Sequence, residues 1–293
     1  MNKIIILIIL LLNFFTITYA ADWKDLHSKA DVISLVEAQQ ALKIKSFTIT
    51  DAYVLGLVHL NLHQDELAYQ VFKAILEKVP NSIEAKWGMA EALRRKHDLK
   101  NAEDLLNEVF KVNPQFIPAL ISLAYIKYFQ MEFNLSVRLA LKVIQQGQDG
   151  SDLSNYVRAL SMYAGSKGML AHYGGLFSKA IDGIAVKPNL DRALRLQPNS
   201  PEALFGMGSF YLLAPRIAGG DKSKAEGYFN QAIKVDPYFA DVYVRFAQLA
   251  KINGNKEKYD LYMSKALELD SQNELAIDTI SGRCKFICVG GEE

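Results

Sequence analysis

Cysteine is scarce in this sequence, and neither sign of charge predominates. Only two of the 293 residues are Cys, so disulfide bonds do not form the scaffold of the fold. The 33 Lys and Arg side chains nearly balance the 32 Asp and Glu, which leaves a formal net charge of +1 at pH 7. A protein that binds a polyanion needs a clustered basic surface, so this composition disfavours a nucleic-acid partner. Half of the residues are apolar, and their spacing along the chain is the main evidence for the fold.

The first twenty residues have the composition of an export signal. Lys3 precedes an apolar run from Ile4 to Leu12, and the small residue Ala20 ends the segment. This arrangement predicts a secretory signal peptide over residues 1–20. The alternative is an uncleaved membrane anchor, which is disfavoured because three polar residues shorten the apolar run: Asn13, Thr16 and Thr18. No Cys directly follows the predicted cleavage site after Ala20, so we expect no lipid attachment there. We therefore expect an exported bacterial protein, periplasmic or secreted, without a stable membrane anchor.

The clearest periodic pattern lies in residues 203–237. Leu204, Gly208 and Tyr211 are three or four residues apart, which places them on one face of a helix. A second helical pattern follows a loop and ends at a proline: Ala225, Phe229, Ala232 and Pro237. Two helices cross closely only where a residue has little side chain, so we expect Gly208 to face Ala225 with an aromatic ring beside them. Each such pair leaves an apolar face bare and is stable only when stacked on others.

The order of small and aromatic residues in this segment resembles the tetratricopeptide repeat, with its A-x3-F second helix and closing Pro. The resemblance implies an all-α fold, a solenoid of antiparallel helix pairs that forms a right-handed superhelix. It also implies a scaffold that mediates protein–protein or protein–peptide interaction. No nucleophile, base and orienting group recur in a way that suggests catalysis, so we expect no enzyme activity and no cofactor.

Steps of 34 residues place further copies of the pattern along the chain. Residues 151–200 are predicted to form a lengthened helix pair, and residues 201–239 carry five extra residues between their helices. We therefore expect an N-terminal helical cap over 21–48, and a capping helix with a Cys-containing tail over 274–293. Between them, residues 49–273 form about six repeats: 49–82, 83–116, 117–150, 151–200, 201–239 and 240–273.

The loop inside the fifth repeat is the most distinctive local feature. Pro215, Gly219 and Gly220 stop the first helix, and Asp221 offers an N-cap to the second, so a long capped turn is the simplest interpretation. The loop also resembles an insert in exported bacterial tetratricopeptide proteins, including the T components associated with TRAP transporters. That resemblance implies an alternative function, an accessory subunit of a periplasmic transport system that handles a small apolar ligand. The alternative would be favoured by an apolar cavity bounded by Leu170, Leu176 and Ile184.

The resemblance places an inner surface on the first helix of each repeat. The residues transferred to it are unusually aromatic: Tyr53, Leu57, Trp87, Glu91, Arg94, Arg95, Tyr125, Tyr128, Phe129 and Phe205. An extended peptide or an amphipathic helix could lie there, anchored by the aromatic side chains, with Arg94 and Arg95 paired to carboxylates. Alternatively, many of these aromatic side chains fill the interior of the solenoid. The identity of the partner and any homo-oligomer stay open.

Histidine and cysteine supply the remaining candidates. His59 and His63 are four residues apart and would share a helix face, but no third ligand is evident, so we expect no metal site. Cys284 and Cys288 flank three residues in the tail. Export favours a small disulfide loop, and two free thiols or an intermolecular bond are the alternatives.

Overall fold

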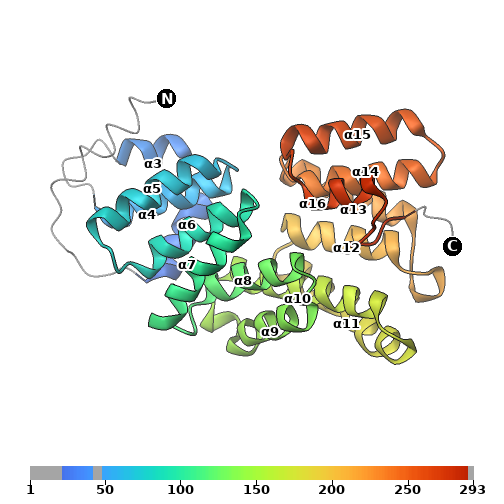
Figure 1. Cartoon of the computed structure of the whole chain (residues 1–293), viewed down its shortest axis with the longest axis horizontal. Helices are drawn as coiled ribbons and strands as arrows, with labels where there is room; N and C mark the ends of the chain where they lie inside the picture. The colour runs from blue at the N-terminus through green and yellow to red at the C-terminus, as the bar shows by residue number, and fades with distance from the viewer. Residues whose placement is uncertain (1–21, 42–47, 290–293) are drawn as a thin grey trace. The chain divides into compact units, whose positions relative to one another are not determined.

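The computed structural model describes residues 22–41 and 48–289. These ranges form fifteen α-helices and one short 3-10 helix, and they contain no strand (Figure 1). The signal peptide predicted over residues 1–20 lies outside the described residues. No helix within the described ranges is long and apolar enough to cross a bilayer.

The chain divides into two compact units, which are described separately. Unit 1 runs to Ile126 and includes Asp149–Asp152, and unit 2 contains Lys127–Gln148 and the chain from Leu153 onward. The helices of unit 1 are α2 (Trp23–Val32), α3 (Leu35–Ala41), α4 (Ile49–Asn61), α5 (Asp65–Lys78), α6 (Ile83–Arg95), α7 (Leu99–Val112) and most of α8 (Ile117–Phe129). Unit 2 holds most of α9 (Phe133–Gly150), then α10 (Leu153–Tyr173), α11 (Leu176–Leu196), α12 (Pro201–Leu213), η1 (Arg216–Ala218), α13 (Lys222–Val235), α14 (Ala240–Ile252), α15 (Lys256–Leu269) and α16 (Glu274–Ser281).

The turn inside three successive helix pairs has the same backbone conformation. His63, His97 and Met131 adopt positive φ angles of 54°, 64° and 63°, and they are 34 residues apart. This left-handed conformation is uncommon for residues other than glycine. Gly254 adopts it in the turn between α14 and α15, with a φ of 68°. The repeat therefore imposes one turn geometry at this position, and His, Met and Gly residues all adopt it.

Small residues bring the helices of a pair together around an aromatic ring. Phe72 of α5 is fully buried. A β-carbon placed on Gly56 of α4 would lie 2.6 Å from Cζ of this ring, and one placed on Gly88 of α6 would lie 2.6 Å from its Cδ1. Phe72 therefore fills the space between the first helix of its own pair and that of the next pair, at positions where no side chain other than hydrogen fits.

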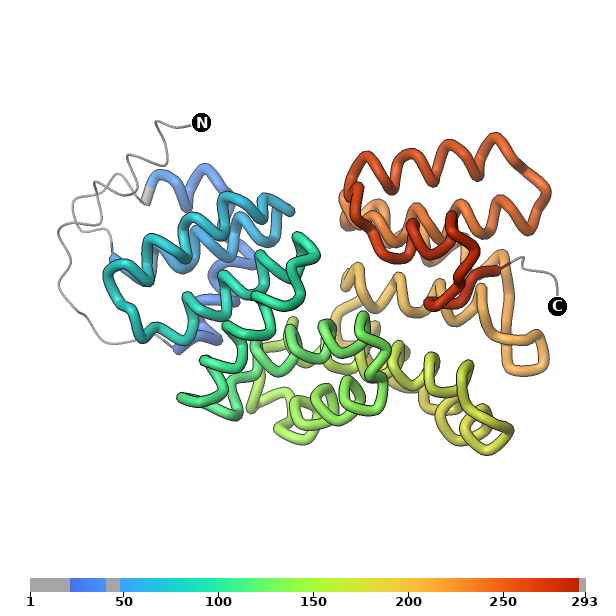
Figure 2. The backbone as a smooth tube through the Cα atoms, viewed as in Figure 1, coloured from blue at the N-terminus to red at the C-terminus, as the bar shows by residue number. Residues whose placement is uncertain are grey.

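Consecutive helices pack as antiparallel pairs in both units, as the smooth trace of α14 and α15 illustrates (Figure 2). The all-α fold of paired helices predicted from the sequence is confirmed. Over the segment predicted to be a lengthened pair, α10 and α11 have 21 residues each, whereas α12 has 13 and α13 has 14. Unit 2 thus contains one pair that extends about two turns beyond its neighbours.

Candidate protein-binding surfaces

Helix α2 lies on an aromatic surface of unit 1. We call this surface the aromatic platform and define it as Tyr53 of α4, Trp87 of α6 and Phe116, just before α8. The His27 ring of α2 is 5.1 Å from the Trp87 ring, and its Nε2 forms a 3.2 Å hydrogen bond with the Tyr53 hydroxyl. The Trp23 ring meets Phe116 edge to face at 5.7 Å. The segment predicted to be an end cap therefore contacts aromatic residues of the first two repeats.

Polar contacts fix the position of α2 on the platform. The Lys24 ammonium donates to the carbonyl oxygen of Asp149 at 3.1 Å, and the Asn61 amide of α4 donates to the Ala30 carbonyl at 3.3 Å. Lys29 pairs with Asp51 at 3.5 Å. Asp22 caps the start of the helix by accepting from the N–H of Lys24. These contacts involve both ends of α2, so its register on the platform is defined.

Burial beneath α2 changes the chemistry of the platform. Tyr53 is 3% exposed, and this burial raises the pKa of its hydroxyl well above the ordinary value, with smaller contributions from Glu84 and Asp152. The tyrosine therefore stays protonated across the physiological pH range and serves as a neutral hydrogen-bond partner for His27.

Four of the residues predicted to line a binding surface on α4 and α6 are buried. Tyr53, Leu57, Trp87 and Glu91 are each at most 4% exposed. Tyr53 and Trp87 are covered by the ring of His27, which the periodic pattern of the repeats does not reveal. Tyr53 and Trp87 therefore belong to a surface that α2 occupies.

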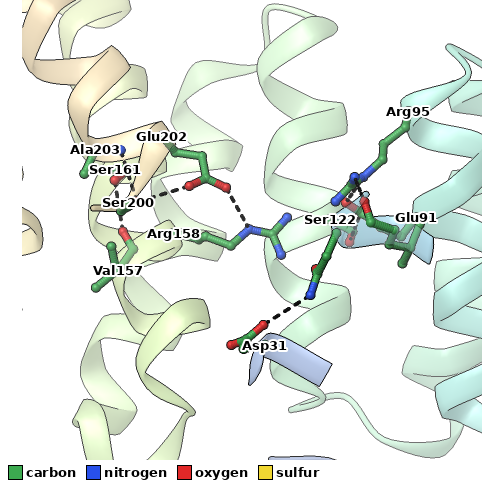
Figure 3. A network of polar contacts seen from close by, with 12 residues as sticks. Asp31, Glu91, Arg95, Ser122, Val157, Arg158, Ser161, Ser200, Glu202 and Ala203 are labelled. Carbon is green, nitrogen blue, oxygen red and sulfur yellow. Dashed lines mark hydrogen bonds and ion pairs between the residues drawn. The ribbon is translucent and has the colours of Figure 1, made fainter. Parts of the chain in front are cut away.

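The two arginines expected to bind a ligand carboxylate are already paired with a carboxylate of the chain. Glu91 accepts from Nε and Nη2 of Arg94 at 2.9 and 2.7 Å, and from Nε of Arg95 at 3.2 Å. It also accepts from the Ser122 hydroxyl at 2.7 Å (Figure 3). The Arg94 guanidinium lies 4.8 Å from the Tyr125 ring centre. The charges of Arg94 and Arg95 therefore balance a buried Glu, and recognition of a partner carboxylate by these arginines stays a prediction.

In unit 2 the predicted surface residues belong to aromatic clusters. Tyr128 stacks on Phe286 with centres 5.7 Å apart, and Phe129 meets the same ring edge to face at 6.0 Å. Phe205 lies 5.1 Å from Phe239. The structure thus brings Tyr128 and Phe129 together around a residue of the C-terminal tail, and Phe205 packs against the same apolar cluster.

The C-terminal tail forms a disulfide-closed loop held by side chains of three helices. Cys284 and Cys288 are bonded to each other, which selects the loop among the alternatives open at the sequence level. Arg245 of α14, Asp278 of α16 and Tyr173 of α10 all hydrogen-bond to the backbone of residues 285–287. Sequence reasoning did not find these three residues, because they are far apart in the chain and follow no repeat.

Comparison with known proteins finds one repeat family in part of the chain and a shared fold among solved structures. The profile of the tetratricopeptide repeat matches residues 240–273, which contain α14 and α15. The chain has the tetratricopeptide-repeat fold. No curated protein matches it significantly in sequence.

Solved structures share this fold at low identity. The human IFIT1 dimer with m7Gppp-AAAA is 16% identical, with a TM-score of 0.57, over 87% of this chain and 59% of that one. The APC/C hetero-tetramer Cut9–Hcn1 is 12% identical, with a TM-score of 0.53, over 88% of this chain and 45% of that one. Pseudomonas aeruginosa PilF is 15% identical over 84% of this chain and 99% of that one, with a TM-score of 0.47. At these identities the likeness concerns the fold alone.

The loop inserted between α12 and α13 is closed on its own backbone. The Asp221 carboxylate accepts from the N–H groups of Ser223 and Lys224, as predicted for an N-cap. The N–H of Asp221 donates to the carbonyl oxygen of Tyr211 at 2.8 Å, and the N–H of Gly220 donates to the carbonyl oxygen of Pro215 at 3.1 Å. Gly219 has a φ of 99°, which favours glycine. In this tetratricopeptide fold the insertion is therefore a capped turn, and Ile217 at its tip is 99% exposed.

The apolar cavity that would favour a transport subunit is not found among the described residues. Leu176 and Ile184 are 85% and 74% exposed, so they do not bound a closed cavity with Leu170. Phe177 and Ile181 of the same helix are also exposed. These four residues form an apolar stripe on α11, the second helix of the longest repeat.

The histidines and acidic residues form no metal site in the part of the chain that the structure describes. His59 is buried, and its Nδ1 lies 2.6 Å from the Gln64 side-chain oxygen. Burial lowers the pKa of His59, and the hydrogen bond with Gln64 opposes this effect. His59 therefore has a structural role near the end of α4, the first helix of the first repeat.

Proposed function

We propose that this protein is an exported, non-enzymatic scaffold that binds another protein, and that the aromatic platform of unit 1 accepts an amphipathic helix. The observation that carries this proposal is the seating of α2 on Tyr53, Trp87 and Phe116. Tetratricopeptide-repeat proteins are in general interaction scaffolds, and the fold supports that role without naming a partner. Export rests on the leader pattern of residues 1–20.

The residues of α2 that face the platform have the spacing of a helix bound in a groove. Trp23, Leu26, His27 and Ala30 are at positions i, i+3, i+4 and i+7, and Leu26 and Ala30 are buried. Asp25 and Ser28 on the opposite side are exposed. This is the pattern by which amphipathic helices dock on proteins. The platform therefore selects a helix that presents a tryptophan, an aliphatic residue and a histidine within two turns.

A partner helix competes with an occupant that is tethered but short. Helix α2 has 10 residues, and an isolated helix of that length is marginal in water. Its contacts with the platform must therefore supply most of its stability. The tether gives α2 a high effective concentration, so a partner must bind more tightly than α2 or act when α2 is weakened. Helix α2 thus sets a threshold for partner binding.

The test uses the mature chain and a labelled peptide of residues 22–33. In one variant, Trp23→Ala and His27→Ala together remove the two rings of α2 that contact the platform. We expect the peptide to bind this variant about tenfold more tightly than the wild type, because the tethered competitor is weakened. The Ser28→Ala variant is the matched control, since Ser28 is exposed, and it should behave like the wild type.

Two further measurements decide the outcome. A peptide carrying both alanines should bind neither chain, and thermal melting followed by circular dichroism should show that unit 1 of the double variant stays folded. Equal binding of the original peptide to all chains would overturn the proposal. If the peptide binds as expected, crosslinking and pull-down from the native cell envelope identify the partner. The partner should be enriched on the double variant, which lacks the rings of Trp23 and His27, relative to the wild type.

A further inference from the structure

The loop of residues 284–288 is bound in unit 2 through its backbone. The Tyr173 hydroxyl donates to the Lys285 carbonyl at 2.7 Å, and the N–H of Phe286 donates to the Asp278 carboxylate at 2.9 Å. Arg245 donates to the carbonyls of Phe286 and Ile287 at 3.0 and 2.7 Å. The N–H of Ile287 closes the turn on the Cys284 carbonyl. Three side chains from different helices therefore recognise three consecutive residues by their peptide groups.

The charged members of this set are deeply buried, which distinguishes them from surface groups that meet a tail by chance. Arg245 is 4% exposed and Asp278 is 2% exposed. Arg245 Nε and Asp278 Oδ1 are buried and make no hydrogen bond among the described residues. A buried charge is costly unless it is satisfied by well-placed partners. The loop provides such partners, and any segment with the same backbone shape would provide them equally.

One side chain of the loop enters an aromatic pocket. Phe286 is 6% exposed, and its ring stacks on Tyr128 and meets Phe129. Phe133 and Met169 belong to the same apolar cluster. Buried aromatic residues at the centre of an interface contribute most of the binding energy in protein complexes. Recognition of this loop therefore combines peptide groups, which are independent of sequence, with one phenylalanine.

The disulfide holds the loop in a conformation that open chains rarely adopt. Cys284 and Ile287 have positive φ angles of 53° and 62°, which are disfavoured for residues with a β-carbon. A covalent link between residues four apart removes many of the alternative conformations of the free loop. Without the link, the loop must lose more conformational entropy to enter the site, so its occupancy falls.

We propose that Tyr173, Arg245 and Asp278 form a binding site for a phenylalanine-bearing peptide segment of another protein, and that the Cys284–Cys288 loop fills this site until a dithiol reduces it. The dithiol supplies two electrons and two protons, becomes a disulfide itself, and leaves thiols on Cys284 and Cys288. The site belongs to unit 2 and rests on contacts independent of the aromatic platform, so it stands or falls separately from the function proposed above.

The first experiment measures hydrogen exchange in the full mature chain, oxidised and after treatment with dithiothreitol. We expect the Phe286 amide, which donates to Asp278, to exchange at least about tenfold faster after reduction, while amides in the middle of α14 are unchanged. The Cys284→Ser, Cys288→Ser double variant should match the reduced chain without any reductant. Unchanged protection of Phe286 in both would overturn the redox part of the proposal.

The second experiment measures binding of a labelled linear peptide, RSKFISV, in which serine replaces both cysteines of the loop. The Phe286→Ala chain keeps its disulfide but has an empty aromatic pocket, and we expect it to bind the peptide at least about tenfold more tightly than the oxidised wild type. The peptide RSKAISV, which lacks the ring, is the control and should bind neither chain. Equal binding of the two peptides would overturn the proposed specificity.

Tyr173 provides a site variant that is safe for folding because its side chain is half exposed. Added to the Phe286→Ala chain, Tyr173→Phe removes only the hydroxyl that reaches the Lys285 carbonyl. It should weaken RSKFISV binding by about fivefold, the effect of one hydrogen bond. Undiminished affinity with an unchanged melting temperature would place the peptide elsewhere and overturn the assignment of the site.

Discussion

Gly208 of α12 faces the ring of Phe229 of α13 so closely that a β-carbon at Gly208 would lie 2.5 Å from Cε1 of the ring. Real β-carbons almost never approach a neighbour below about 3 Å, because packing in protein interiors is close to that of organic crystals. Phe229 is fully buried and also contacts Phe246 of the next repeat at 5.5 Å. The absence of a side chain at Gly208 therefore sets the distance between α12 and α13. It also fixes the position of the Phe229 ring, which contacts α14 as well.

Replacing Gly208 with alanine should lower the free energy of unfolding of unit 2 by about 1–3 kcal/mol, because the ring of Phe229 has to move. The matched control is Gly227→Ala in α13, where a β-carbon would meet nothing within 4 Å. That change should raise stability by up to about 1 kcal/mol through helix propensity. Urea unfolding of both variants measures the difference, and effects of the same sign would contradict the packing argument.

Glu91 should be the most costly single carboxylate to remove from unit 1. Glu91→Ala leaves the guanidinium groups of Arg94 and Arg95 without the buried carboxylate that they share, and we expect a loss of about 3–5 kcal/mol. Glu77→Ala, on the exposed side of α5, is the control and should stay within about 0.5 kcal/mol. An equally small decrease in the free energy of unfolding for both variants would contradict this, because it would show that Glu91, Arg94 and Arg95 are solvated by water.

The buried position of His59 should make stability depend on pH. Its pKa is lowered by burial, whereas the unfolded chain restores the ordinary value of 6.5. Below that value the unfolded state binds a proton that the folded state does not, so the free energy of unfolding falls as pH decreases, until the folded state is protonated as well.

The variant His59→Gln replaces the titrating imidazole with a side chain that does not titrate, and it keeps a polar group near Gln64. Its unfolding free energy, measured in urea at about pH 7.5 and about pH 5.5, should therefore fall less than that of the wild type. An identical decrease in both proteins would assign the pH dependence to other groups.

Both units have their aromatic surface covered by a short segment from near one end of the chain. In unit 1 the segment is a helix that presents Trp23 and His27, and in unit 2 it is a disulfide-closed loop that presents Phe286. The covering segments differ in chemistry: α2 contacts its surface mainly through side chains, whereas the loop is held mainly through its peptide groups. Under the two proposals made above, the availability of these surfaces is set separately, by competition with α2 in unit 1 and by the oxidation state of Cys284 and Cys288 in unit 2.

The spacing of small and aromatic residues was sufficient to predict the helix pairs, because a repeat is stabilised by contacts within about 34 residues that recur in register. The N-cap at Asp221 was predictable for a similar reason, since a capping side chain acts on backbone groups two or three residues away. The disulfide was predicted only as one of several alternatives, because spacing does not show whether two thiols meet.

Only the tertiary structure decided which surfaces are covered. The ring of His27 covers Tyr53 and Trp87, which are 26 and 60 residues away, and Arg245 binds the carbonyl of Phe286 at a separation of 41 residues. No periodicity links these positions, because each covering segment occurs once and its contacts depend on how several helices stack. The sequence alone determined the repeated unit, whose contacts are local and recurrent, whereas the occupation of its surfaces arose from single, long-range contacts that exist only in the folded chain.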